Sequence, residues 1–196
     1  MLRLIMVGVL AVVACMAASA RAQADGSLLG GNCGSVAPVF APWGDSASYY
    51  FPANGGFESG ASGWSLSGGA AVVDGNEPFY LHNGGDSHAL LIPAGGSATT
   101  SVCFGVLYPA LRFVAEGSGA RIRVSVSAKN LLGFASTLDG GTFTAGSSWA
   151  PSPKLSSLLS AVTSPLGAKS MQVTISVSGA SAQVDDLYID PFALKR

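Results

Sequence analysis

Two consecutive aspartates near the end of the chain carry charges that are hard to satisfy. Asp185 and Asp186 lie in the run Val184-Asp-Asp-Leu-Tyr-Ile-Asp190, which alternates as a strand does. Successive strand residues point to opposite faces, so one of the two carboxylates must point among apolar neighbours, where an unpaired charge is costly. A cation or backbone N–H groups could satisfy that carboxylate, or it could pair with an arginine, of which the candidates are Arg112, Arg121 and Arg123.

A loop with two histidines offers a second set of polar side chains. In His82-Asn-Gly-Gly-Asp-Ser-His88, the ligand types of His82, Asp86 and His88 suit a transition metal. A Gly-Gly-Asp stretch is also typical of a solvated hairpin loop. We favour the solvated loop over the metal site.

The sequence gives no sign of a catalytic centre. It contains no Gly-x-Ser-x-Gly, Ser-x-x-Lys or His-Glu-x-x-His motif and no Gly-Lys-Ser/Thr phosphate loop. Glu58 or Glu77 could pair with Asp74 for glycoside hydrolysis, but only their separation in space decides this. The sequence therefore predicts no catalytic residues.

The aromatic residues are numerous enough for a binding surface. Trp64 stands at the start of an apolar run, where aromatic side chains belong to a core. Trp149 and Tyr80 lie in turn-rich segments, where side chains more often reach a ligand. We therefore predict Trp149 and Tyr80 as ligand-binding residues.

The elements that position these residues belong to one ordered domain. The 196 residues are 48% hydrophobic and 11% charged, with a formal net charge of -1. This composition excludes charge-driven disorder, and it excludes a basic surface able to neutralise many phosphates, so nucleic acid is not an expected partner.

The first 24 residues have the pattern of a secretory signal peptide. Arg3 precedes an uncharged apolar run over 4–18, and small residues follow at cleavage spacing. That run is shorter than the roughly 18 residues of a membrane-spanning helix, so we expect no transmembrane helix in the mature chain. Cys15 lies in a sequence similar to a lipoprotein box, which leaves lipidation open. The predicted location is extracellular.

Two cysteines remain after the signal peptide. In an oxidising compartment, Cys33 and Cys103 are expected to form a disulfide. It would close a loop of about 70 residues and contribute roughly 4 kcal/mol in the loop-entropy model. Two separate buried thiols are the alternative.

The mature chain has the period of two that strands require. Apolar residues alternate with polar ones over 120–128 and over 170–178, and shorter runs lie at 65–73, 88–92, 98–104, 111–115 and 183–189. Residues 154–162 suit a strand or a short helical turn equally. We predict an N-terminal arm over 25–42 and an all-β sandwich domain over 43–196.

Two motifs at opposite ends of the β region carry a family resemblance. The segment Asn54-Gly-Gly-Phe-Glu-Ser-Gly-Ala-Ser-Gly-Trp64 resembles the opening of carbohydrate-binding-module jelly rolls of the galactose-binding-like superfamily, and Val184-Asp-Asp-Leu-Tyr-Ile-Asp-Pro191 resembles their final strand. More narrowly, the chain is similar to uncharacterised secreted actinobacterial proteins in Pro42-Trp-Gly-Asp45, Tyr50, Gly75-Asn-Glu-Pro78 and Trp149.

The resemblance implies a jelly-roll β-sandwich of two antiparallel sheets whose first and last strands are neighbours. It also implies a structural calcium ion near these strands, for which Glu58, Asp186 and Asp185 are the expected ligands. Asp185 could instead accept backbone hydrogen bonds or pair with an arginine.

We therefore expect a secreted, non-catalytic module that binds carbohydrate or cell-envelope polysaccharide. A structural or protein-interaction domain at the cell surface is the alternative, and an unrecognised hydrolase is the least favoured. Polysaccharide is the expected partner class.

Overall fold

The structure is a computed structural model that describes residues 33–103, 110–130, 135–156 and 168–191. The predicted signal peptide, Cys15 and residues 25–32 of the arm lie outside this part of the chain. The described part contains one short 3₁₀ helix, η1 (Ala41–Trp43), and otherwise strands and connections. None of its helices has the length and apolar character needed to cross a membrane.

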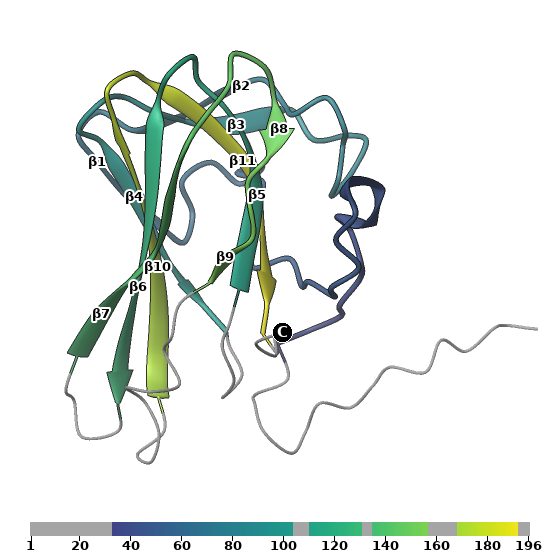
Figure 1. Cartoon of the computed structure of the whole chain (residues 1–196), viewed down its shortest axis with the longest axis vertical. Coiled ribbons are helices and arrows are strands. Elements are labelled where there is room, and N and C mark those ends of the chain that lie inside the picture. Colours follow the sequence, from purple (N-terminus) through teal and green to yellow (C-terminus); the bar gives the residue numbers. More distant parts are fainter. Residues whose placement is uncertain (1–32, 104–109, 131–134, 157–167, 192–196) are drawn as a thin grey trace, which may run out of the picture.

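Eleven strands form two antiparallel sheets packed face to face (Figure 1). The five-stranded sheet has the order β1-β4-β10-β6-β7, from β1 (Trp64–Ser67), β4 (Ser97–Val102), β10 (Ala168–Ser178), β6 (Arg121–Asn130) and β7 (Ala135–Thr144). The six-stranded sheet has the order β2-β3-β11-β5-β8, and β9 also pairs with β5. Its strands are β2 (Ala71–Asp74), β3 (His88–Ile92), β11 (Ala182–Asp190), β5 (Ala110–Glu116), β8 (Ala150–Pro151) and β9 (Leu155–Ser156). This confirms the predicted all-β jelly-roll sandwich.

The alternation seen in the sequence places the core between the two sheets. Val124 pairs with Ile175 and Val126 with Val173, and all four side chains are buried. The intervening serines and threonines face solvent on the outer side of the five-stranded sheet, so each strand buries one face, as its period of two requires.

The run at 65–73 is not one strand. It divides into β1 and β2, which lie in different sheets. Gly68 and Gly69 separate them with φ values of 63° and 81°, a backbone conformation that favours glycine. Strand β7, which contains Asp139-Gly-Gly141, was not predicted, because its sequence lacks a clear alternation. Of residues 154–162, Leu155–Ser156 form a strand and 157–162 lie outside the described residues.

The N-terminal segment covers the outer face of the six-stranded sheet. It lies beside β11 and β5 on the side away from the five-stranded sheet, in dark blue in Figure 1. Phe40, Tyr49 and Tyr188 form a second buried cluster there. Arg112 of β5 lies over the Phe40 ring at 4.5 Å and donates to Asp45 at 3.0 Å.

The predicted disulfide joins Cys33 to Cys103, with a Cα–Cα distance of 5.4 Å. It links the start of the described chain to the residue that follows β4. The covering segment is therefore held at one end by a covalent bond.

Candidate functional site

A β-bulge in β11 brings the two consecutive aspartates to one place. The pairing of β11 with β5 shifts register between Asp185 and Tyr188, and Asp186 has a φ of 50°. Val184 and Leu187 therefore both face the core, although three positions apart. The expectation that simple alternation continues through this strand was wrong: the bulge resets the phase, and both aspartates are buried, at 0% and 2% exposure.

The bulge follows from a close contact with residues 50–57. The backbone N–H of Leu187 donates to the carbonyl of Gly55 at 3.0 Å. A Cβ on Gly55 would lie 2.9 Å from the Leu187 carbonyl oxygen, and a Cβ on Gly56 would lie 2.9 Å from Asp186 Oδ1. Only glycine permits this approach, which places the Phe57 turn beside the last strand, as predicted.

A third buried carboxylate organises the connection between β2 and β3. Glu77 is 0% exposed, and its two oxygens accept from the backbone N–H groups of Phe79 and Leu81 at 2.5 and 2.6 Å. Its own N–H donates to Asp185 Oδ2 at 3.2 Å. We considered Glu77 in the sequence only as a hydrolytic carboxylate, because no local motif marks a residue that holds a loop from inside.

The environment of the aspartates favours their protonated forms. Burial, with the nearby charges of Glu77 and Glu58, raises the pKa of Asp185 to about 7, although backbone N–H groups of Glu77 and Asp186 oppose this. Burial, with the charges of Asp185 and Glu77, raises the pKa of Asp186 to about 8. Near neutral pH, ionising both carboxylates therefore requires a compensating positive charge.

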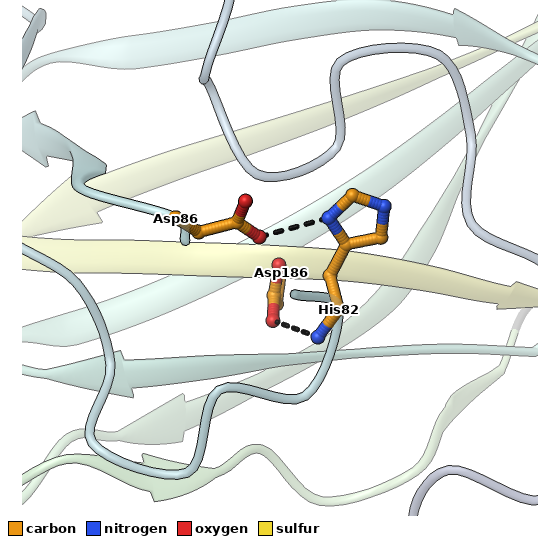
Figure 2. A group of neighbouring side chains, drawn as sticks. All are labelled: His82, Asp86 and Asp186. Carbon is orange, nitrogen blue, oxygen red and sulfur yellow. Dashed lines mark hydrogen bonds and ion pairs between the residues drawn. The ribbon is translucent and has the colours of Figure 1, made fainter. Parts of the chain in front are cut away.

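Asp186 also joins His82 and Asp86 (Figure 2). Its Oδ2 accepts from the backbone N–H of His82 at 3.0 Å, and His82 Nδ1 lies 2.8 Å from Asp86 Oδ2. Potential metal-ligating atoms of the three side chains all lie within 4.8 Å of one another. Asp186 Oδ1 is buried without a hydrogen-bond partner.

Glu58 and His88 form a separate surface pair. Glu58 Oε1 accepts from the N–H groups of Ser87 and His88, both at 2.8 Å, and Oε2 lies 3.0 Å from His88 Nδ1. Burial opposes ionisation of Glu58, but these hydrogen bonds outweigh it and lower its pKa. The same contact raises the pKa of His88. Glu58 is thus outside the group of Figure 2. So is His88, which could have joined His82 and Asp86 in the metal site that we disfavoured from the sequence.

The exposed aromatic side chains gather on two loops rather than on a sheet. Trp43, Phe79 and Tyr80 are 37%, 40% and 51% exposed, and the Trp43 and Phe79 rings pack edge to face with centroids 5.0 Å apart. Trp43 and Phe79 were not predicted as ligand-binding residues. Phe79 directly precedes Tyr80, so the turn-rich segment that singled out Tyr80 could also have identified it. Trp149 is half-buried before β8, and Trp64 is a core residue, as predicted.

The outer face of the five-stranded sheet has a different chemistry. A groove of about 570 Å³ is lined by side chains that are mostly polar: Arg121, Arg123, Asp139, Thr142, Ser176, Val177 and Ser178. Arg123 pairs there with Asp139 at 3.4 Å. This face offers hydroxyl and charged groups, and its groove has no aromatic lining residue among those described.

No protein-family model matches the chain, and no curated protein matches it. Solved structures do show the same fold. The CBM22-1 xylan-binding domain of a Paenibacillus barcinonensis protein is 14% identical, with a TM-score of 0.51, over 76% of this chain and 97% of that domain.

Two larger structures contain a similar domain. The CBM22-1 and GH10 modules of a Clostridium thermocellum endo-1,4-β-D-xylanase, complexed with xylohexaose, are 14% identical with a TM-score of 0.52, over 76% of this chain and 29% of that one. The enzymatically active domain of tailspike protein 4 of bacteriophage CBA120 is 15% identical with a TM-score of 0.51. The match covers 70% of this chain and 20% of that one. At these identities the similarity establishes the fold alone.

Proposed function

We propose that the protein is a non-catalytic carbohydrate-binding module whose ligand packs on Trp43, Phe79 and Tyr80. The observation that carries the proposal is the exposure of these three aromatic residues on adjoining loops. Sugar rings present C–H faces that pack on aromatic surface, while their hydroxyl groups bind polar groups at the rim.

The loop that carries two of the three residues is held in place before any ligand arrives. The Glu77 carboxylate accepts from the N–H groups on both sides of Tyr80, and the Tyr188 hydroxyl donates to the Leu81 carbonyl at 3.3 Å. Tyr80 itself has a φ of 50°, an unusual conformation for a bulky residue. A loop fixed in this way loses little conformational entropy on binding, which favours affinity.

The acidic residues support binding better than hydrolysis. A glycoside hydrolase needs two carboxylates that reach the scissile bond from either side. Glu77 is fully buried with both oxygens accepting backbone N–H groups, and Asp185 and Asp186 are equally inaccessible. Glu58 is held against the start of β3 by three hydrogen bonds. Glu77 and Glu58 instead hold loops and the start of β3 in place through backbone hydrogen bonds.

The module is proposed to act outside the cell. The Cys33–Cys103 disulfide is consistent with an oxidising compartment. Secretion through residues 1–24, lipidation of Cys15 and the narrower similarity to actinobacterial proteins stay predictions from the sequence. So does the calcium ion expected at Glu58, Asp185 and Asp186, of which only the two aspartates share a buried site.

The test is retention on insoluble polysaccharides. Xylan is the first probe, because one structure of this fold is a xylan-binding domain, followed by β-1,4-galactan, cellulose and bacterial cell walls. We expect the double variant Phe79→Ala/Tyr80→Ala to abolish retention of the full chain and Trp43→Ala to weaken it. Trp149→Ala separately tests the other ligand-binding residue predicted from the sequence. Thr174→Val, on the five-stranded sheet, is the control and should retain binding.

Two outcomes would overturn the proposal. Retention unchanged in the Phe79→Ala/Tyr80→Ala variant would place the ligand elsewhere. Failure to bind any of the polysaccharides, with recovery of a protein partner that the same variant loses, would favour the alternative of a protein-interaction domain on the cell surface.

A further inference from the structure

Three side chains from two distant parts of the sequence converge on one point. His82 and Asp86 belong to the connection between β2 and β3, whereas Asp186 belongs to the bulge of β11 (Figure 2). Their ligand atoms lie within 4.8 Å of one another. Ligands 2.0–2.2 Å from a shared Zn²⁺ ion are roughly 3–4 Å apart, so small side-chain movements would suffice to hold one ion.

The unpartnered oxygen of Asp186 points into this group. Asp186 is 2% exposed, and its Oδ2 is occupied by the N–H of His82, but Oδ1 has no hydrogen-bond partner. Figure 2 shows this second oxygen directed toward the Asp86 carboxylate. When Asp186 is ionised, the two carboxylates repel each other and its buried oxygen has no partner, which is costly. A cation between them would remove both penalties.

Among the described residues, neither lysine nor arginine offsets the negative charge of these carboxylates. Asp185 and Glu77 are fully buried beside Asp186, and the ion pairs found in the described part of the chain bring neither lysine nor arginine to any of the three. The single cationic group in contact with this region would be His82, whose Nδ1 already faces Asp86 at 2.8 Å.

We propose that His82, Asp86 and Asp186 bind a divalent transition-metal ion of the zinc class. One imidazole nitrogen and two carboxylate oxygens are a donor set that suits Zn²⁺, whereas Ca²⁺ takes six to eight oxygen ligands. The ion would take the place of the hydrogen between His82 Nδ1 and Asp86. This site differs from the calcium site predicted from the sequence in the ion and in two of its three ligands.

The surrounding structure orients the proposed ligands. The imidazole of His82 stacks on the Phe51 ring, with centroids 3.8 Å apart and planes 9° from parallel. The side chain of Asp86 is only 8% exposed, while that of His82 is 38% exposed. One side of the group is therefore open to solvent, which provides an entry path and room for a water ligand.

A bound ion would fasten the connection between β2 and β3 to β11. That connection carries Phe79 and Tyr80, so metal binding would also fix the aromatic surface. The metal site does not depend on the proposed carbohydrate function, because its test measures the ion alone.

The test is metal titration of the full chain after treatment with a chelator. A Cys15→Ser background removes a thiol that could bind Zn²⁺ by itself. Zn²⁺ and Ca²⁺ are titrated separately by calorimetry. Co²⁺ is followed by its visible absorption, which is intense in a tetrahedral zinc-type site and weak in an octahedral one. We expect one Zn²⁺ per chain, a Co²⁺ spectrum, and a higher Tm with Zn²⁺.

The two histidines of the chain provide a matched pair of variants. His82→Asn should weaken Zn²⁺ binding by at least roughly 10–100-fold, the loss seen for groups that only support a ligand, and should remove the Co²⁺ bands. His88→Asn should leave both unchanged, since His88 pairs with Glu58 outside the group. Asp86→Asn should resemble His82→Asn.

Either of two results would overturn the proposal. One is a Zn²⁺ affinity that His82→Asn leaves unchanged, or that His88→Asn lowers as much as His82→Asn does. The other is Ca²⁺ binding without any Co²⁺ spectrum, which would instead support the calcium ion predicted from the sequence.

Discussion

The outer faces of the two sheets differ in what covers them. On the five-stranded sheet, serine, threonine and charged side chains meet solvent directly, and burial alternates regularly over residues 121–129 of β6 and 171–178 of β10. On the six-stranded sheet, the chain from Ala37 to Phe57 packs over β11 and β5 and buries an arginine and two aspartates. The candidate sites lie on the covered face, where the bulge of β11 places two consecutive aspartates among buried residues.

The largest expected effect is a difference in stability between variants of two arginines, one on the outer face of each sheet. Arg112 is buried with Asp45, whereas Arg123 is more than half exposed with Asp139. Arg112→Met leaves the Asp45 charge without its partner, so we expect a loss of about 3 kcal/mol in the free energy of unfolding. Arg123→Met should cost no more than about 1 kcal/mol. Urea denaturation measures both, and equal losses would contradict the comparison.

A smaller effect is expected where the covering segment meets β11. Gly55→Ala places a Cβ 2.9 Å from the Leu187 carbonyl oxygen, which belongs to the backbone and must shift. Such overpacking costs about 1–3 kcal/mol. The control is Gly84→Ala, since a Cβ there meets nothing within 4 Å. A thermal unfolding midpoint unchanged in Gly55→Ala would show that the bulge does not depend on this contact.

Acid should weaken the contact between Arg112 and Asp45 on the covered face. Burial raises the pKa of Asp45, but hydrogen bonds from Tyr49, Ala47 and Arg112 outweigh it and hold the pKa below the ordinary value of 3.8. The stabilisation is therefore complete above that value and is lost as pH falls through the lower folded-state pKa. The stability difference between wild type and Asp45→Asn should shrink below about pH 4. A difference that grows on acidification would reverse this assignment.

The smallest effect is expected on the solvated face. The hydroxyl groups of Thr99 and Thr174 lie 2.8 Å apart across neighbouring strands, in contact with solvent on one side. Thr174→Val should change the free energy of unfolding by no more than about 0.5 kcal/mol and leave polysaccharide retention intact. Loss of retention in this variant would move the ligand to the five-stranded sheet.

The sequence allowed the fold class and the disulfide to be predicted because both follow from local or compositional signals. Alternation over β6 and β10 identifies strands with one wet face. In a chain predicted to be exported, the two cysteines beyond the signal peptide leave one simple pairing. The adjacency of the Phe57 turn to Leu187 came from the resemblance of the two end motifs, and the structure confirms it through the hydrogen bond from Leu187 to Gly55.

The site was harder to predict because its geometry is set by contacts between distant residues. The conformation of Asp186 depends on Gly55, more than a hundred residues earlier, so the β11 sequence alone reads as a regular strand. Glu77 acts on its own loop from a buried position that nothing nearby in the chain signals. His82 and Asp86 were recognised as potential ligands, but their third partner came from β11 rather than from His88.

Both sheets receive their middle strand from the last part of the chain. β10 inserts between β4 and β6, and β11 inserts between β3 and β5. Until residues 168–190 have been synthesised, each sheet is split into two halves with open edges, and the contacts that close them are distant in sequence. Stable folding must therefore wait until both strands have been synthesised. A truncation before β11 should therefore aggregate rather than fold.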